Sequence, residues 1–275
     1  MKILYQGSPG AYSHLAALQV YPDAEIISCK TFDQCFEQAK KNDELRIIIP
    51  ESNRTTGSIG IEYLIFKYRL NIYAEHFLKI EHNLLGMKGA KVKDLKNVFS
   101  HAQALSQCSK FINNNELIAN IHADTAGSAK EVAKLNNKED AAIASKLAAE
   151  IYDLKIIQDN IQDTIRNITR FVIMSKEMAV INPEEDKTMC TMVYEVKSIP
   201  AALYKSLGGF ATNGVNITKL ESYIHPQGFD VAQFYIDFEG HPDNPSVKLA
   251  LDDLKFYSKK YNLLGIYKAA NFRKK

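Results

Sequence analysis

Apolar residues in the first part of the chain recur at spacings that predict alternating strands and helices. Short apolar runs at Lys2–Tyr5, Glu25–Ser28 and Leu45–Ile49 predict strands, and the last run is apolar enough to be buried on both faces. One helix is expected from Ser13 onward, and a second follows Thr31 as N-cap. The second carries apolar residues on one face: Phe32, Cys35, Phe36 and Ala39. This βαβαβ order predicts a parallel sheet with right-handed crossovers.

The middle of the chain repeats the alternation. Strands are expected at Leu84–Met87, Val98–Phe99 and Ala141–Ala144, and helices at Ala102–Asn113, Ala126–Leu135 and Lys146–Tyr152. A polar stretch at Asn160–Asn167 precedes an apolar strand at Thr169–Met174. A chain that leaves one α/β lobe, builds a second and returns predicts two lobes with a ligand cleft at the carboxyl ends of the strands.

The pattern changes after residues 181–187, where Pro183 and several charges predict a linker. The elements expected beyond it are strands at Thr188–Lys197, Val215–Ser222, Asp230–Phe238 and Leu263–Tyr267, a helix that starts near Pro200 and stops at Gly214, and a helix through Val247, Ala250, Leu251 and Leu254. The order βαββαβ predicts a ferredoxin-like layer of antiparallel sheet and two helices.

Composition excludes several classes of protein. The 275 residues are 46% hydrophobic and 24% charged, which is ordinary for a globular chain and unlike a disordered or fibrous one. The net charge of +2 gives no electrostatic case for nucleic acid or an anionic membrane, and no apolar run is long enough to span a membrane. The opening MKILYQGSPG does not resemble a signal peptide, which argues against an exported transport-type binding protein.

The four cysteines show neither a CxxC motif nor a spacing typical of metal ligands. We therefore expect reduced thiols, no metal site and a cytoplasmic protein.

Two polar segments follow predicted strands and could line the cleft. In Gly7–Ser13, free backbone N–H groups and the Ser13 hydroxyl could hold a carboxylate at a helix start, although an ordinary Gly/Pro turn has the same pattern. In Pro50–Ser58, Asn53 and its neighbours offer amide, hydroxyl and guanidinium donors, and a polar loop that caps a helix is the alternative.

Two further segments complete the candidate site. Ser100–Gln107 contains His101, which is either a general acid or base or an exposed residue at a helix start. Asn167–Phe171 brings a hydroxyl, a guanidinium and an aromatic ring to a strand start, where an exposed arginine is the alternative. The sequence contains no phosphate loop and no Ser/His/Asp motif. Together the four segments indicate a cleft rich in hydrogen-bond donors, and hence a small anionic ligand.

Several of these segments resemble those of prephenate dehydratases. Asn167–Phe171, with Asp163 before it, resembles the family's N-x-T-R-F signature, and Gly7–Ser13 resembles G-P-x-G-T-F-S. Ser100–Leu105 is similar to S-H-P-Q-A-L, and Ala141–Ser145 to A-A-I-A-S. In the C-terminal part, Pro200–Leu203 and Glu221–Tyr223 resemble the P-G-A-L and E-S-R motifs of the family's ACT domain. The resemblance covers nearly the whole chain.

The resemblance implies an α/β fold with a two-lobed, periplasmic-binding-protein-like catalytic domain at residues 1–180 and a ferredoxin-like ACT domain at 188–275. The lobes would comprise residues 1–77 with 166–180, and 78–165. The implied activity converts prephenate to phenylpyruvate, water and carbon dioxide in phenylalanine biosynthesis, without a metal or organic cofactor. It further implies L-phenylalanine as an allosteric effector and a homodimer or homotetramer.

The resemblance also implies roles for particular residues. Thr169 would donate a hydrogen bond to the departing hydroxyl, because the enzyme mainly has to orient a dianion and help that hydroxyl leave. The implied substrate-binding residues are Ser13, Asn53, Gln103, Arg170 and Phe171. The implied phenylalanine-binding residues are Ala201, Ala202, Leu203, Glu221 and Ser222.

The departures from the family pattern that bear on function are Ala11 for Thr, Ser52 for Glu, Arg54 for Ser, Ala201 for Gly and Tyr223 for Arg. Two alternatives stay open beside prephenate dehydratase: no residue decides against the first, and Ser52 and Arg54 favour the second. One is an arogenate dehydratase, whose substrate carries an amine in place of the keto group. The other is a catalytically weak sensor of aromatic amino acids.

Overall fold

A computed structural model of the chain describes residues 1–185, 187–224 and 232–274. The chain divides into two compact units, within each of which the residues pack mainly against one another. Unit 1 comprises residues 1–68 and 76–172, and unit 2 comprises residues 69–75 and 173–275. Within the described ranges, no helix has both the length and the apolar character that crossing a membrane requires.

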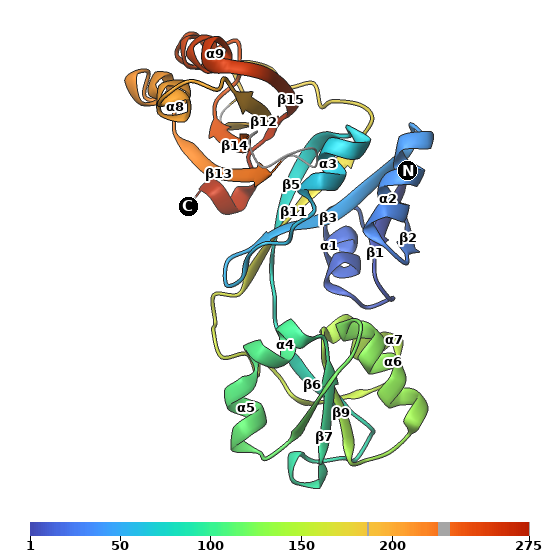
Figure 1. The fold of residues 1–275 in the computed structure, drawn as a ribbon. Coiled ribbons are helices and arrows are strands. Elements are labelled where there is room, and N and C mark those ends of the chain that lie inside the picture. The colour runs from blue at the N-terminus through green and yellow to red at the C-terminus, as the bar shows by residue number, and fades with distance from the viewer. Residues whose placement is uncertain (186, 225–231, 275) are drawn as a thin grey trace. The chain divides into compact units, whose positions relative to one another are not determined.

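The first sheet has the strand order β2-β1-β3-β11-β5, with β4 paired to β3 (Figure 1). Its strands are β1 (Lys2–Gln6), β2 (Glu25–Cys29), β3 (Leu45–Asn53), β4 (Gly57–Ser58), β5 (Asn71–Lys79) and β11 (Ile168–Ser175). Its helices are α1 (Tyr12–Val20), α2 (Phe32–Lys41) and α3 (Glu62–Tyr68). β1 runs parallel to both β2 and β3, which confirms the parallel βαβαβ start.

Helix α2 forms where the sequence predicts it. The Thr31 hydroxyl accepts a hydrogen bond from the Gln34 N–H at 3.1 Å, so one of the unpaired N–H groups at the helix start is satisfied. Cys35, Phe36 and Ala39 are fully buried, as their spacing predicts. Strand β5 was not predicted. Its buried positions recur every third residue and do not alternate.

The second sheet of unit 1 has the order β10-β6-β9-β7-β8. Its elements are β6 (Asn83–Gly86), η1 (Val92–Asp94), β7 (Asn97–Ser100), α4 (Ala102–Gln107), α5 (Ser109–Asn114), β8 (Ile118–Ile121), α6 (Thr125–Leu135), β9 (Asp140–Ala144), α7 (Lys146–Ile151) and β10 (Lys155–Gln158). β7 is parallel to β8 and β9, whereas β6 is antiparallel to β9 and β10, so the sheet is mixed. The chain passes between the two sheets at residues 80–82 and again at 159–167.

The single helix expected at Ala102–Asn113 is instead two helices that meet at Cys108. The Asp163 carboxylate accepts hydrogen bonds from the Lys110 N–H at 3.2 Å and from the Ser109 hydroxyl at 2.9 Å. An acceptor at the start of α5 stabilises a new helix N-terminus there.

Most of unit 2 follows the predicted βαββαβ order, which confirms the ferredoxin-like fold (Figure 1). Its elements are β12 (Thr188–Val196), α8 (Ala202–Thr212), β13 (Ile217–Ile224), β14 (Ala232–Glu239), α9 (Pro245–Tyr257), β15 (Ser258–Lys268) and η2 (Asn271–Lys274). The sheet order is β13-β14-β12-β15, and the pairings within it are antiparallel. Helices α8 and α9 pack on one face of the sheet, where Phe210 of α8 shares a core with Met192 and Phe238 of the strands. The start of the strand expected from Asp230 lies outside the described residues.

Unit 2 also contains the first half of β5, which packs against the C-terminal segment. The Arg273 Nε donates to Glu75 Oε1 at 2.6 Å, and its Nη2 donates to Oε2 at 3.1 Å. The Ala270 N–H donates to the same carboxylate at 3.2 Å. At Gly265, an added Cβ would lie 2.2 Å from the Ile72 carbonyl oxygen, so β15 and β5 approach too closely for a larger residue.

Candidate active site

Asn53 and Thr169 form the centre of the candidate site. Asn53 ends β3 and Thr169 lies near the start of β11, and both are buried. The Asn53 Oδ1 accepts hydrogen bonds from the backbone N–H groups of Thr55 at 2.9 Å and Thr56 at 3.2 Å. Its Nδ2 therefore faces the other way and donates to Thr169 Oγ1 at 2.9 Å. Because Thr169 Oγ1 accepts this bond, its own proton is available for another partner.

The hydrogen bonds continue from Asn53 through the second connection between the sheets. Asn53 Nδ2 also donates to Asn167 Oδ1 at 2.8 Å, and Asn167 Nδ2 donates to Gln107 Oε1 at 2.9 Å. The same Gln107 oxygen lies 2.8 Å from His82 Nε2, and His82 Nδ1 lies 2.9 Å from the Tyr12 hydroxyl. We refer to these residues, from Thr169 to Tyr12, as the polar chain.

Four members of the polar chain had no role predicted from the sequence: Tyr12, His82, Gln107 and Asn167. Tyr12, Gln107 and Asn167 lie in segments expected to line the cleft, whereas His82 lies outside all of them. A signal for His82 was present, because it is an imidazole at the edge of a predicted apolar strand.

Arg170 lies beside Thr169 in sequence but makes a different contact. Successive residues of a strand point to opposite faces, so Arg170 leaves β11 on the other side from Thr169. Its Nη1 lies 3.3 Å from Glu51 Oε2, and both side chains are almost completely buried. The Ser52 hydroxyl donates to the same Glu51 oxygen at 2.8 Å. Ser52 thus contacts a carboxylate here, whereas the family pattern has its own carboxylate at that position.

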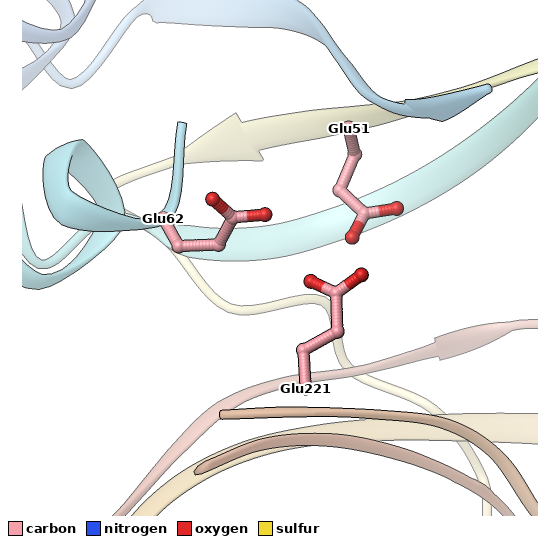
Figure 2. Close-up of side chains that lie close together, drawn as sticks. All are labelled: Glu51, Glu62 and Glu221. Carbon is pink, nitrogen blue, oxygen red and sulfur yellow. The ribbon is translucent and has the colours of Figure 1, made fainter. Parts of the chain in front are cut away.

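Glu62, at the start of α3, adds a second buried carboxylate to this region. Carboxylate oxygens of Glu51 and Glu62 lie within 4.8 Å of one another, and Figure 2 shows the two side chains extending toward a common space. The Ser58 hydroxyl donates to Glu62. Arg54 is exposed, so its guanidinium does not share this burial.

The turn before α1 places Ser13 at the helix start. Gly10 has a φ of 92°, and a Cβ there would lie 2.8 Å from Ala148 Cα, so only glycine fits. The Ser145 hydroxyl donates to the Gly10 carbonyl at 2.5 Å, which fixes the turn against the start of α7. Ser13 is 8% exposed in the first turn of α1, and Ala11 holds the N-cap position in an extended conformation.

The remaining predicted substrate residues differ in exposure. Gln103 is exposed on α4, and its Nε2 donates to Thr56 Oγ1 at 2.5 Å, next to the loop that fixes Asn53. Phe171 is 1% exposed and lies two residues after Thr169 on the same strand. His101 is an exposed N-cap whose Nδ1 accepts from the Gln103 N–H at 3.3 Å. Its contacts match the structural alternative of a residue at a helix start.

The residues expected to bind phenylalanine lie in unit 2. Ala201 is the N-cap of α8 with a φ of 58°, Ala202 is buried and Leu203 is half-buried. Register pairs Ser222 with Phe234 and Phe234 with Tyr194, so Ser222 lies two strands, roughly 10 Å, from the strand that leads to α8. Both groups are therefore at the same end of the sheet but separated by β14.

Glu221 is held by its neighbours on β13. The Lys219 ammonium lies 3.3 Å from Glu221 Oε2, and the Tyr223 hydroxyl donates to the same oxygen at 3.0 Å. Burial lowers the pKa of Lys219, and the Glu221 and Asp237 carboxylates act against that shift. A cavity of about 500 Å³ in unit 2 lies elsewhere, and its lining includes Thr188, Glu239 and His241 but none of the predicted phenylalanine-binding residues.

Comparison with known proteins gives the family. The model of the prephenate dehydratase family matches residues 3–179 of the chain, which is most of its length. The chain belongs to the prephenate dehydratase family. The match includes every residue of the polar chain, so the candidate site lies within the family's own domain.

The relatives of this prephenate dehydratase family member carry different names. A bifunctional N-acyl-homoserine lactone acylase/prephenate dehydratase of Komagataeibacter europaeus is 39% identical, over 99% of this chain and 98% of that protein. Arogenate dehydratase 2 of Petunia hybrida is 36% identical, over 97% of this chain and 71% of that protein. A prephenate dehydratase structure from Arthrobacter aurescens in complex with L-Phe is 25% identical with a TM-score of 0.89, and the match covers 98% of this chain and 91% of that one.

These comparisons confirm the family resemblance, the fold class and the expectation of an enzyme. They support membership of a prephenate or arogenate dehydratase family in aromatic amino-acid biosynthesis. The roles of Thr169 and of the five substrate-binding residues remain predictions.

Proposed function

We propose that the protein is a prephenate dehydratase, which converts prephenate to phenylpyruvate, water and carbon dioxide. The observation that carries this proposal is the orientation of Asn53. Its amide is fixed by backbone N–H groups, so Thr169 Oγ1 accepts from it and points its own proton elsewhere. A hydroxyl oriented in this way is suited to donate to the hydroxyl that leaves the prephenate ring.

The dehydration reaction requires few further functions from the protein. The ring carboxylate leaves as carbon dioxide, and the electron pair of its C–C bond moves into the ring while the C–O bond to the hydroxyl breaks. The departing hydroxide takes up one proton to become water, and the ring becomes aromatic. Orientation of the dianion and stabilisation of the developing hydroxide are the tasks left to the site. The helix start at Ser13 supplies N–H donors of the kind that bind carboxylates.

An assay of the purified protein with prephenate and arogenate side by side tests this proposal. Phenylpyruvate from prephenate, at a higher kcat/KM than phenylalanine from arogenate, is the expected result. The Petunia relative makes arogenate the second candidate substrate, and the reverse preference would assign the protein to that activity. Turnover of neither substrate would favour the sensor function.

The name of the Komagataeibacter relative justifies one further arm of the assay. That relative is similar over nearly the full length of both chains, so an N-acyl-homoserine lactone belongs among the substrates tested. Release of the acyl chain, lost in the Thr169→Val variant, would show a second activity of the same site. Release that survives the substitution would locate it elsewhere.

For unit 2 we propose control by L-phenylalanine through an ACT-type domain. Two findings support this: the βαββαβ fold of the unit, and the full-length similarity to a prephenate dehydratase crystallised with L-Phe. Ala201–Leu203 and Glu221–Ser222 are the proposed contacts, and a homodimer or homotetramer is the proposed assembly. Calorimetric titration with L-phenylalanine, with sedimentation to give the assembly state, tests both. No saturable binding up to millimolar concentrations would contradict the proposal.

A further inference from the structure

The polar chain has a direction that its own donors and acceptors determine. At one end, the backbone N–H groups of Thr55 and Thr56 face Asn53 Oδ1, so Asn53 presents its NH2 group to Asn167. Asn167 must receive that bond on Oδ1, and it then presents its own NH2 group to Gln107. Gln107 must accept on Oε1, so each amide along the chain has a defined orientation.

At the other end of the polar chain, the hydrogen bonds of His82 have the same donor-to-acceptor direction, toward Gln107. His82 Nε2 lies 2.8 Å from Gln107 Oε1, which can only accept, so Nε2 carries a proton. His82 is 2% exposed, and burial lowers its pKa, which favours the neutral ring. A neutral ring protonated at Nε2 has an unprotonated Nδ1, which accepts from the Tyr12 hydroxyl at 2.9 Å.

The backbone near His82 is consistent with this tautomer. The Tyr12 hydroxyl also lies 2.8 Å from the Glu81 carbonyl oxygen, its other candidate acceptor. That oxygen also accepts a hydrogen bond from Asn83 Nδ2 at 3.0 Å, and its second lone pair lets it share the Tyr12 proton with His82 Nδ1. Because Nδ1 of the neutral ring can only accept, the Tyr12 hydroxyl is the donor in its contact with His82, and the direction of every bond from Tyr12 to Thr169 is consistent.

The position of His82 in the fold shows which elements the polar chain connects. His82 lies in the connection between β5 and β6, Tyr12 starts α1 beside the first sheet, and Gln107 ends α4 beside the second. The imidazole therefore joins elements of both sheets at the point where the chain crosses between them. Gln107 Oε1 receives two donors, His82 and Asn167, which together leave its amide a single orientation.

We propose that His82 is a positioning residue for the dehydration, a role that rests on the proposed function. Its Nε2–H holds the Gln107 amide, which holds Asn167, so that Asn53 and Thr169 keep the geometry in which the Thr169 proton faces the substrate. Without His82 the Gln107 amide has one donor fewer and gains rotational freedom. A catalytic group that is misplaced in this way lowers kcat more than it raises KM.

The test compares His82→Leu and His82→Gln with a matched control. Leucine removes both ring nitrogens, whereas glutamine keeps an N–H donor near the position of Nε2. His76 on β5 is the control, because its Nε2 lies 3.1 Å from Gln19 Oε1 in the same kind of His–Gln pair, outside the polar chain. We expect His82→Leu to lower kcat for prephenate about tenfold with KM within twofold, His82→Gln to recover most of kcat, and His76→Leu to match the wild type.

A second measurement does not depend on turnover or on a variant that folds. The ¹⁵N chemical shifts of the histidine rings in the wild-type protein report the tautomer, and we expect His82 to be neutral and protonated at Nε2. A wild-type protein without prephenate turnover would count against the proposed function. An active wild type whose His82→Leu variant keeps full kcat, or an His82 ring protonated at Nδ1, would overturn the positioning role.

Discussion

Thr169 is the residue on which the proposed chemistry most depends. In Thr169→Val the β-branched shape and strand propensity remain, while the hydroxyl that faces the substrate is lost. We expect kcat to fall on the order of 10²–10³-fold, the usual effect of removing one preorganised donor. Circular dichroism and thermal unfolding check the fold, and Thr218→Val on β13 is the control for the same change outside the site. Near-normal turnover in a folded Thr169→Val variant would remove Thr169 from the mechanism.

Arg170 tests a different question, whether its buried ion pair with Glu51 is structural. Removing one partner of a buried ion pair typically costs about 3–5 kcal/mol, because a charge remains in a poorly solvated place. We therefore expect Arg170→Met to lower the free energy of unfolding by that order, measured by urea denaturation. Arg170→Lys should lose less stability but still lower kcat/KM, since an ammonium cannot reproduce the planar fork of donors. An Arg170→Met variant as stable as the wild type would contradict a structural role.

At the scale of elements, local signals were sufficient for some features and not for others. Helix α2 was predictable because its cap at Thr31 and its apolar spacing lie within the helix itself. Strand β5 was missed because its place in the sheet depends on β11, about a hundred residues further along the chain. The break at Cys108 depends on Asp163, which no local pattern reveals. The imidazole of His82 is visible beside a predicted strand, but its role was missed because its partners Tyr12 and Gln107 are distant in sequence.

The start of α8 gives a prediction at the element scale. Ala201 has a left-handed backbone conformation, with a φ of 58°, which glycine adopts at little cost and alanine does not. We expect Ala201→Gly to raise the free energy of unfolding by about 0.5–1 kcal/mol, after the greater freedom of glycine in the unfolded chain is subtracted. Ala202→Gly, at the first position of the helix, should instead lower it by up to about 1 kcal/mol. Urea denaturation of both variants checks this, and a loss of stability in both would contradict it.

The stability of the whole molecule should depend on pH through its buried histidines. Burial lowers the pKa of His14, His76 and His82 from the ordinary value of 6.5. Below about pH 6.5 the unfolded chain binds more protons at these rings than the folded one, so the free energy of unfolding falls as the pH falls through that range. Above pH 6.5 the three contributions are fully present. Urea denaturation between about pH 5 and 7.5 measures the slope, which should be shallower in His82→Gln. A stability that rises toward low pH would contradict this assignment.

Strand β5 connects the C-terminal fold to the polar chain, and this gives the last prediction. Its first half contacts β15 and the C-terminal segment at Ile72 and Glu75, and its last residue, Lys79, stands three positions before His82. Truncation at the linker would remove the partners of both contacts, so loss of inhibition in a truncated protein would not by itself demonstrate an effector site. A point substitution within the β5–β15 contact is the sharper probe.

Gly265→Ala places a methyl group against the Ile72 carbonyl oxygen. Because this oxygen is a backbone atom, the clash is relieved only if the backbone of β5 or β15 shifts. Overpacking of this kind costs about 1–3 kcal/mol, and we expect that loss in urea denaturation. Gly208→Ala is the matched control: its Cβ meets nothing within 4 Å, it lies inside α8, and alanine should stabilise it by about 0.5–1 kcal/mol. If phenylalanine binding in unit 2 acts on the catalytic residues through β5, Gly265→Ala will also weaken inhibition by phenylalanine while Gly208→Ala leaves it unchanged. Equal inhibition in both variants would exclude β5 as the route. Gly265→Ala alters the contact between β15 and β5, and an inhibitory effect carried by β5 depends on that contact.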